Sequence, residues 1–83
     1  KGALMRHLVE THPREHLELI DGVKIFEPQN ERWVLVLPDA GEPLVHIFAN
    51  GSDRQWVEEA TQHYRQKIQH FAHADIEVES VHH

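Results

Sequence analysis

The chain has 83 residues, which is enough for one domain and too few for two. Its 8 Lys and Arg stand against 14 Asp and Glu, so the formal net charge is −6 with His neutral. This sign disfavours nucleic acid and anionic membrane surfaces as partners, because both are negatively charged. The absence of Cys excludes disulfides, thiolate zinc sites and a cysteine nucleophile.

The two ends of the chain bear on its origin. It begins at Lys1 rather than at Met, so we expect an excised piece of a longer protein. No apolar run approaches the roughly 20 residues that span a bilayer, and no signal peptide is visible. We therefore expect no membrane partner and a cytoplasmic location. His82 and His83 either belong to the protein or begin a purification tag.

Two amphipathic helices are predicted, one near each end. Residues 2–12 carry an apolar stripe of helical period, and Pro13 ends this element because it disfavours helical geometry in the residue before it. Ser52 followed by Gln55 fits a capping box, which predicts the start of the second helix. The apolar stripe of the second helix comprises Trp56, Val57, Ala60, Tyr64, Ile68 and Phe71.

Four β-strands are predicted between the helices. They comprise residues 16–20, 23–26, 32–37 and 44–49. Asp21-Gly22 predicts a hairpin between the first two strands, because Gly accepts a positive φ without steric cost. Residues 28–31, which include Pro28 and Asn30, form a turn by composition. The third strand is nearly all apolar, which is typical of a central strand.

These elements predict an α+β domain with an antiparallel sheet of about four strands and two helices on one face. The order α-β-β-β-β-α is like that of the TATA-binding protein. We place the domain at residues 1–73 and expect residues 74–83 to be a tail, part of it tag if the terminal His residues are foreign. Residues 76–79 alternate apolar and acidic, so an edge strand is the alternative.

The middle of the chain resembles a known family. Residues 21–25 (DGVKI), 33–36 (WVLV) and 38–43 (PDAGEP) are similar to the C-terminal domain of the phosphoglucomutase and phosphomannomutase family, the phosphohexomutases. In that family a DGVK strand precedes a strand ending in the loop R-P-S-G-T-E-P, and a strand with a second Arg follows. The order of elements matches over residues 1–71. The resemblance implies an antiparallel sheet with helices on one side and a loop that grips the phosphate of a sugar.

The matching loop departs from the family at its anion-binding positions. Leu37 stands in place of the loop Arg and Asp39 in place of the Ser, which removes a charge-assisted donor and adds a negative charge. Like charges about 4 Å apart repel by about 1 kcal/mol even in water, so we expect mutase-type phosphate binding to be lost or very weak. The altered substrate-binding loop comprises Pro38, Asp39, Ala40, Gly41, Glu42 and Pro43, with His46 at the position of the second Arg.

The pattern LVLPDxxEP with a following His is also similar to the C-terminal region of bacterial mannose-1-phosphate guanylyltransferase-like proteins. The resemblance implies a parent protein in sugar-phosphate or sugar-nucleotide metabolism, with Mg²⁺ as a cofactor of the parent enzyme and none in this domain. The family's phosphoserine and metal-binding Asp residues lie in other domains, so we expect no catalytic residue here. The implied partners are the other domains of the parent chain and a sugar phosphate.

Three functions stay open from the sequence. The first is a non-catalytic accessory domain of a phosphohexomutase-like protein. The second is the substrate-closing domain of an active phosphomannomutase or phosphoglucomutase, in which His46 and loop N–H groups replace the Arg contacts. The third is a protein-interaction module that uses the uncovered face of the sheet, which predicts an apolar patch there.

Each candidate residue also has a purely structural interpretation. Residues 38–43 can simply link two strands, and if they hold a ligand, Asp39 and Glu42 suit a neutral or cationic group better than a phosphate. Trp33 and Trp56 can stack on a sugar ring, but we expect both in or beside the core.

Two pairs on the second helix have spacings at which they can share a metal ion: Glu59 with His63, and His70 with His73. Neither pair has an obvious third ligand. We therefore expect solvated side chains and no metal site.

Overall fold

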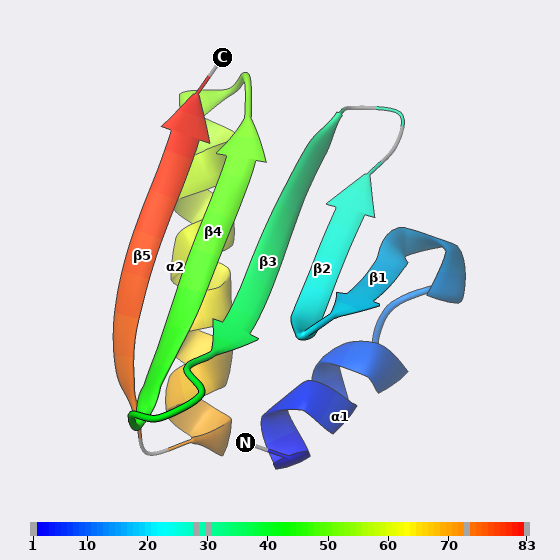
Figure 1. Ribbon diagram of the computed structural model, residues 1–83. Helices are drawn as coiled ribbons and strands as arrows, with labels where there is room; N and C mark the ends of the chain where they lie inside the picture. The colour runs from blue at the N-terminus through cyan, green and yellow to red at the C-terminus, as the bar shows by residue number, and fades with distance from the viewer. Residues whose placement is uncertain (1, 28, 30, 73, 83) are drawn as a thin grey trace.

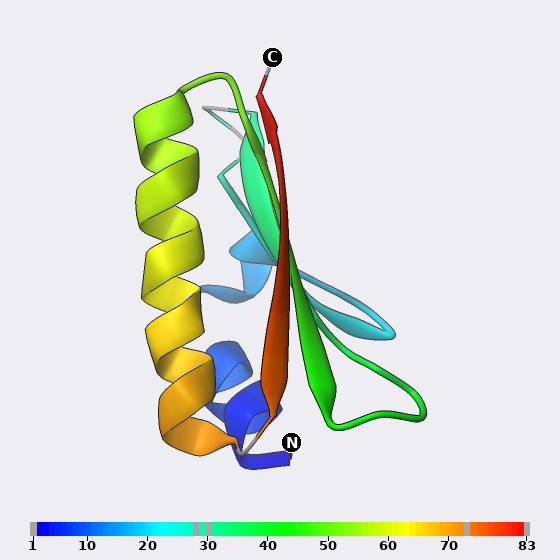
Figure 2. The same cartoon turned by 90° about the vertical axis from the view of Figure 1, so that its left-hand side faces the viewer.

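The computed structural model describes residues 2–27, 29, 31–72 and 74–82. In this part of the chain a five-stranded sheet carries both helices on one face (Figure 1, Figure 2). The elements in chain order are α1 (Gly2–Glu10), η1 (Arg14–His16), β1 (Leu17–Ile20), β2 (Gly22–Glu27), β3 (Arg32–Pro38), β4 (Leu44–Gly51), α2 (Arg54–Phe71) and β5 (Asp75–His82). The predicted α+β class is confirmed, and the predicted central strand is β3. Of the residues singled out from the sequence, Lys1, Pro28, Asn30, His73 and His83 lie outside the described part.

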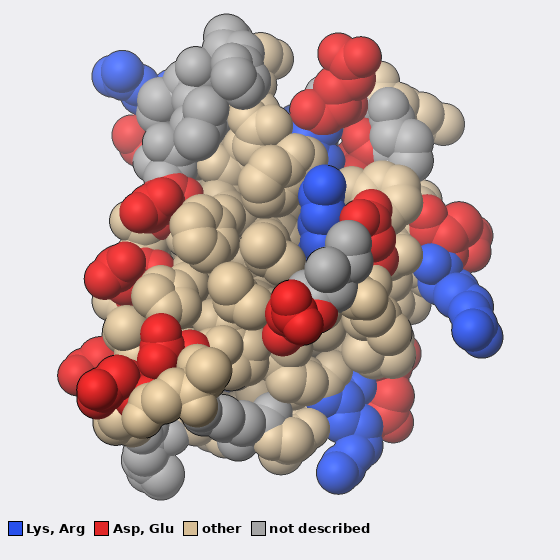
Figure 3. Space-filling model, viewed as in Figure 1, with Lys and Arg blue, Asp and Glu red and all other residues tan. Residues whose placement is uncertain are grey.

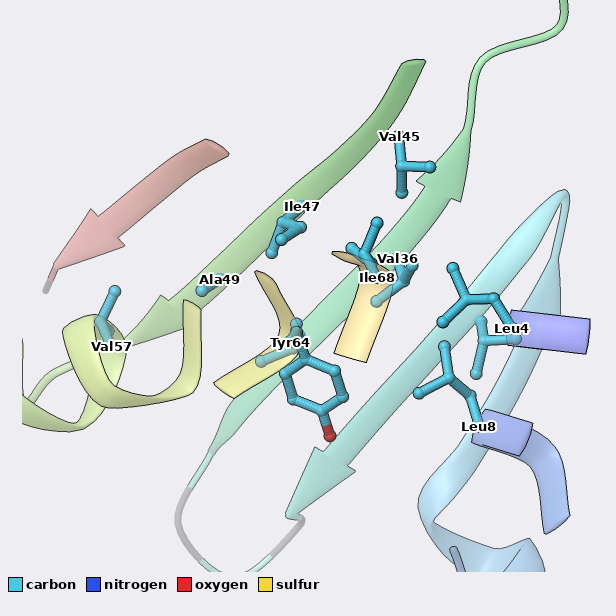
Figure 4. Packing of buried hydrophobic residues seen from close by; sticks show 11 residues of the cluster. Leu4, Leu8, Val36, Val45, Ile47, Ala49, Val57, Tyr64 and Ile68 are labelled. Carbon is cyan, nitrogen blue, oxygen red and sulfur yellow. The ribbon is translucent and has the colours of Figure 1, made fainter. Parts of the chain in front are cut away.

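The core lies between the helices and the face of the sheet that they cover. Every second residue of β4 is buried, as expected for a strand covered on one side. The buried apolar residues are Leu4 and Leu8 from α1, Val23, Val34, Val36, Val45, Ile47 and Ala49 from the strands, and Val57, Tyr64 and Ile68 from α2 (Figure 4). The predicted helix stripes therefore face the sheet. In the first helix the predicted stripe comprises Leu4, Met5, Leu8 and Val9, and of these Val9 is 38% exposed.

The predicted cap of α2 is wrong by one residue. Asp53, not Ser52, is the N-cap, and its carboxylate accepts hydrogen bonds from the backbone nitrogens of Gln55 at 2.9 Å and Trp56 at 3.3 Å. Both residue types are good caps, but only Asp53 reaches the free N–H groups of the first turn. Among the described helices, none combines the length and apolar character needed to cross a membrane.

His12 joins the end of α1 to α2. Its Nδ1 donates to the carbonyl oxygen of Leu8 at 2.8 Å, which leaves Nε2 to accept a hydrogen bond from the Tyr64 hydroxyl at 3.2 Å. Burial raises the pKa of Tyr64 to about 12, so its hydroxyl keeps the proton that it donates. The first helix was predicted to end at residue 12, but α1 ends at Glu10, so His12 makes these contacts from just beyond the helix.

Residues 75–82 form a strand, so the expected tail is wrong for this segment and the alternative of an edge strand is confirmed. β5 pairs in parallel with β4, from Leu44 opposite Asp75 to Gly51 opposite His82. The other strand pairs are antiparallel, so the sheet is mixed. The parallel pairing follows from α2, which crosses over the sheet between β4 and β5. Ile76 packs against the core, which favours ordering of this segment.

Gly22 has a different role from the one predicted for it. In the β1–β2 hairpin Asp21 takes the positive φ, 58°, and Gly22 does not. A Cβ on Gly22 would lie 2.5 Å from the carbonyl oxygen of Val36 and 3.1 Å from Cα of Leu37, both on β3. Gly22 therefore permits the close approach of β2 and β3, which no side chain allows.

Substituting Gly22→Ala is expected to lower the free energy of unfolding by about 1–3 kcal/mol, because β2 and β3 must move apart. Gly41→Ala is the matched control, since no atom beyond its two chain neighbours lies within 4 Å of the added Cβ. We expect the control to stay within about 0.5 kcal/mol of the parent. Urea denaturation of the three proteins measures both values, and a Gly22→Ala variant as stable as the control would contradict the close approach.

Candidate functional site

The candidate site is the β3–β4 loop, residues 39–43, at one end of the sheet (Figure 1). The backbone nitrogen of Asp39 donates to the carbonyl oxygen of Leu44 at 2.8 Å, which closes the base of the loop. The backbone nitrogen of Asp75 donates to the carbonyl oxygen of Pro43 at 2.9 Å, so β5 starts against the loop. Backbone bonds therefore hold this segment independently of its side chains.

The Asp39 side chain organises the loop from within. Its Oδ2 accepts hydrogen bonds from the backbone nitrogens of Gly41 and Glu42, each at 3.0 Å. Its Oδ1 lies 3.1 Å from Nε2 of His46. One carboxylate thus collects two backbone N–H groups and an imidazole nitrogen, a set of donors suited to an oxyanion.

His46 lies between two carboxylates. The strand register places it opposite Leu37 on β3 and opposite Glu77 on β5. Its Nδ1 is 3.5 Å from Oε1 of Glu77, while Nε2 faces Asp39. The His46 ring stacks with Phe48 at 6.1 Å between centroids, and its side chain is only 20% exposed. The imidazole is therefore held in place on several sides.

Asp39 and His46 shift each other's pKa. The hydrogen bond with His46 is the main cause that lowers the pKa of Asp39 below its ordinary 3.8, and the N–H groups of Gly41 and Glu42 lower it further. The hydrogen bond with Asp39 is the main cause that raises the pKa of His46 above its ordinary 6.5, and Glu77 adds to the rise against the effect of burial. The environment therefore favours a carboxylate beside an imidazolium.

The structure brings most of the predicted loop residues together. The hydrogen-bonded cluster unites Asp39, Gly41, Glu42 and His46, while Pro38 and Pro43 lie at the two ends of the loop and Ala40 is exposed. Sequence reasoning missed Glu77. It lies in the segment expected to be a tail, and only the parallel pairing of β5 places it beside His46. The alternation of residues 76–79 was the available signal.

Two pairs in the sequence of α2 and the residues just after it have spacings that could share a metal ion, although no site was expected at either: Glu59 with His63, and His70 with His73. Across the described residues, no three His, Asp or Glu side chains gather as a metal-binding group. The His63 ring packs edge-on against Tyr64 at 5.0 Å, and the His70 ring packs edge-on against Phe71 at 4.8 Å. The predicted partner of His70, His73, lies outside the described residues.

Each Trp carries a cation over its ring. The Lys24 ammonium lies 4.6 Å from the Trp33 ring, and the Arg32 guanidinium lies 4.5 Å from the Trp56 ring. Trp56 packs against the core, as predicted. Trp33 is half-buried on the uncovered face of the sheet, away from the core where it was expected, and Lys24 covers one face of its ring.

A hollow of about 390 Å³ is lined by residues of α2, β2 and β3 and by His12 and His16, away from the loop. The sequence did not predict this hollow, because its lining residues come from four separate segments of the chain. Two of its polar contacts are internal: Arg32 pairs with Glu27, and Tyr64 bonds to His12. These polar groups serve the fold, so the loop is the better candidate site.

No family model matches the chain, and no solved structure matches it. A stretch of 57 residues is 39% identical to the zinc carboxypeptidase of Simulium vittatum. This stretch is 69% of the chain and 18% of that protein, so the chain spans less than a fifth of the relative's length. The resemblance to the phosphohexomutases stays a prediction.

We expect the His46 imidazole to titrate above pH 6.5 and the substitution Asp39→Asn to lower its pKa, because the charged partner is removed. The folded-state pKa is raised, so the stabilisation is fully present below about pH 6.5 and is lost as the pH rises through the folded value. NMR titration of the ring carbon signals measures this pKa. Glu77→Gln should lower it less than Asp39→Asn, and an unchanged value in Asp39→Asn would contradict the pairing.

Proposed function

We propose that this chain is the C-terminal accessory domain of a phosphohexomutase-like protein of sugar-phosphate or sugar-nucleotide metabolism, and that its loop does not hold the sugar phosphate. The observation that carries this proposal is the set of contacts made by the Asp39 carboxylate, which already accepts hydrogen bonds from two loop N–H groups and pairs with the His46 ring. A phosphate ester would need the same donors and would meet the negative charge of Asp39. The domain then contributes packing rather than catalysis.

The fold supports the resemblance behind this proposal. The resemblance implies an antiparallel sheet with helices on one side, and the described strands form such a sheet except for the parallel pair of β4 and β5. Leu37 and His46 stand at the two Arg positions of the family, and they are cross-strand partners. Directly opposed residues share a face of the sheet, so the two positions lie side by side at the loop. Two Arg residues at these positions would reach the same phosphate.

The uncovered face of the sheet supports a packing role. It presents half-buried apolar side chains from three strands: Phe26, Trp33, Leu35, Leu37, Leu44 and Phe48. Figure 3 shows this face, with uncharged side chains over β3 and β4 and acidic side chains along β5. In the proposed parent protein this face packs against the other domains. The same face makes a protein-interaction module the second candidate function.

The remaining parts of the proposal follow from the resemblance. The other domains of the parent chain carry its chemistry and use Mg²⁺, this domain needs no cofactor, and the parent protein is cytoplasmic. Zinc peptidase chemistry is not included, because the shared stretch is 18% of the zinc carboxypeptidase.

Titration with mannose 1-phosphate and glucose 1-phosphate tests the proposal. We expect no saturable shift of the Gly41 and Glu42 amide signals up to about 10 mM ligand, which corresponds to binding weaker than about 3 kcal/mol. The His46→Ala variant should behave in the same way. Millimolar or tighter binding that disappears in His46→Ala would instead support the active substrate-closing domain and contradict the proposal.

A further inference from the structure

We propose that the Asp39 carboxylate is a tethered occupant of an oxyanion receptor, so that its removal lets the β3–β4 loop bind a free oxyanion such as inorganic phosphate. The inference rests on the proposed function, in which the loop has lost its external ligand. Asp39 would then act as a built-in competitor that keeps the receptor closed. The ligand class is a small oxyanion, a phosphate or a carboxylate.

A second Asp in the chain shows what is special about this contact. Asp53 also accepts hydrogen bonds from two backbone N–H groups, but these belong to the first turn of its own helix. Asp39 accepts from two loop N–H groups and in addition faces the His46 ring, seven residues away on β4. Donors from two separate elements therefore converge on one carboxylate, as they do around a bound anion.

The donors are held by contacts that do not need the Asp39 side chain. The backbone bonds between Asp39 and Leu44 and between Pro43 and Asp75 close the loop. Glu77, 3.5 Å from Nδ1 of His46, holds the ring from its other side. Removal of the Asp39 carboxylate therefore leaves Nε2 facing the same place as the two loop N–H groups.

The charges around the position of the removed Asp39 carboxylate set the affinity for an anion. At a pH well below 6.5, the ordinary His pKa, the His46 ring is charged even without Asp39 and attracts an anion, whereas the carboxylates of Glu42 and Glu77 oppose it. Glu42 is exposed and the Glu77 side chain is 58% exposed, so water screens both. We therefore expect weak binding, with a dissociation constant on the order of 1–10 mM for inorganic phosphate.

The experiment compares Asp39→Gly with the parent protein by ¹⁵N NMR during titration with inorganic phosphate. We expect saturable shifts of the Gly41 and Glu42 amides in the variant, at least roughly tenfold tighter than any in the parent protein, because the donors are free and the repelling charge is gone. Phosphate should also raise the pKa of His46 in the variant. Acetate tests whether a carboxylate is accepted, and sodium chloride at equal ionic strength corrects for screening.

Two variants separate occupancy from charge. Asp39→Asn removes the charge but keeps an oxygen that accepts from the loop N–H groups, so we expect it to bind no phosphate. His46→Gln in the Asp39→Gly background should weaken phosphate binding roughly tenfold, since a charge-assisted donor is lost. Asp39→Ala carries the same test should Asp39→Gly fail to fold, which the strand amide signals reveal.

The outcomes distinguish this inference from the proposed function. Phosphate binding by the parent protein as tight as by Asp39→Gly overturns the tethered occupant, and millimolar binding of the sugar phosphates by the parent protein overturns the proposed function. A folded Asp39→Gly or Asp39→Ala that binds no phosphate, beside a parent protein that binds none, overturns only the tethered occupant. Equal binding by Asp39→Asn and Asp39→Gly would overturn it as well, because charge alone would then exclude the anion.

Discussion

The contact between the Asp39 carboxylate and its three donors sets the charge of the β3–β4 loop and ties the loop to β4, while backbone bonds close the loop. Two donors are backbone N–H groups inside the loop, and the third is the His46 ring on β4. Through His46 the contact extends to Glu77 on β5. Charge-assisted bonds of this kind are stronger than neutral ones, so a single side chain links a loop and two strands. An external anion meets a site whose donors are already used.

The architecture explains why these groups meet at all. α2 packs across the covered face of the sheet and returns the chain to the edge beside β4, which makes β5 parallel to β4. The parallel register then sets Glu77 opposite His46. The helices cover only one face, so the half-buried apolar side chains of the other face stay available to a neighbouring domain (Figure 2, Figure 3). We propose two roles that follow from this arrangement: the loop is closed to an external phosphate, and the uncovered face of the sheet packs against another domain.

Local patterns were enough to predict the elements whose burial is periodic. The stripe of α2 and the alternation of β4 both report which face meets the core, and the loop residues around Asp39 follow from the strands that flank them. Interactions between distant segments were not predictable in this way. The pairing of β5 depends on the free edge of β4, and the need for Gly22 depends on the carbonyl oxygen of Val36 across the sheet. Glu77 was not predicted as a site residue because it lies beside His46 only through the pairing of β5 with β4.

A pH titration of the Asp39 carboxyl carbon, followed together with the Gly41 and Glu42 amide protons, is the most direct measurement of a carboxylate held inside the loop. The carboxyl group should titrate below 3.8, and both amide protons should shift with the same midpoint as their bonds to Oδ2 weaken. Because the folded-state pKa is lowered, the stabilisation is present above about pH 3.8 and is lost as the pH falls through the folded value. An Asp39 pKa at or above 3.8, with amide protons that do not follow it, would contradict this structure of the loop.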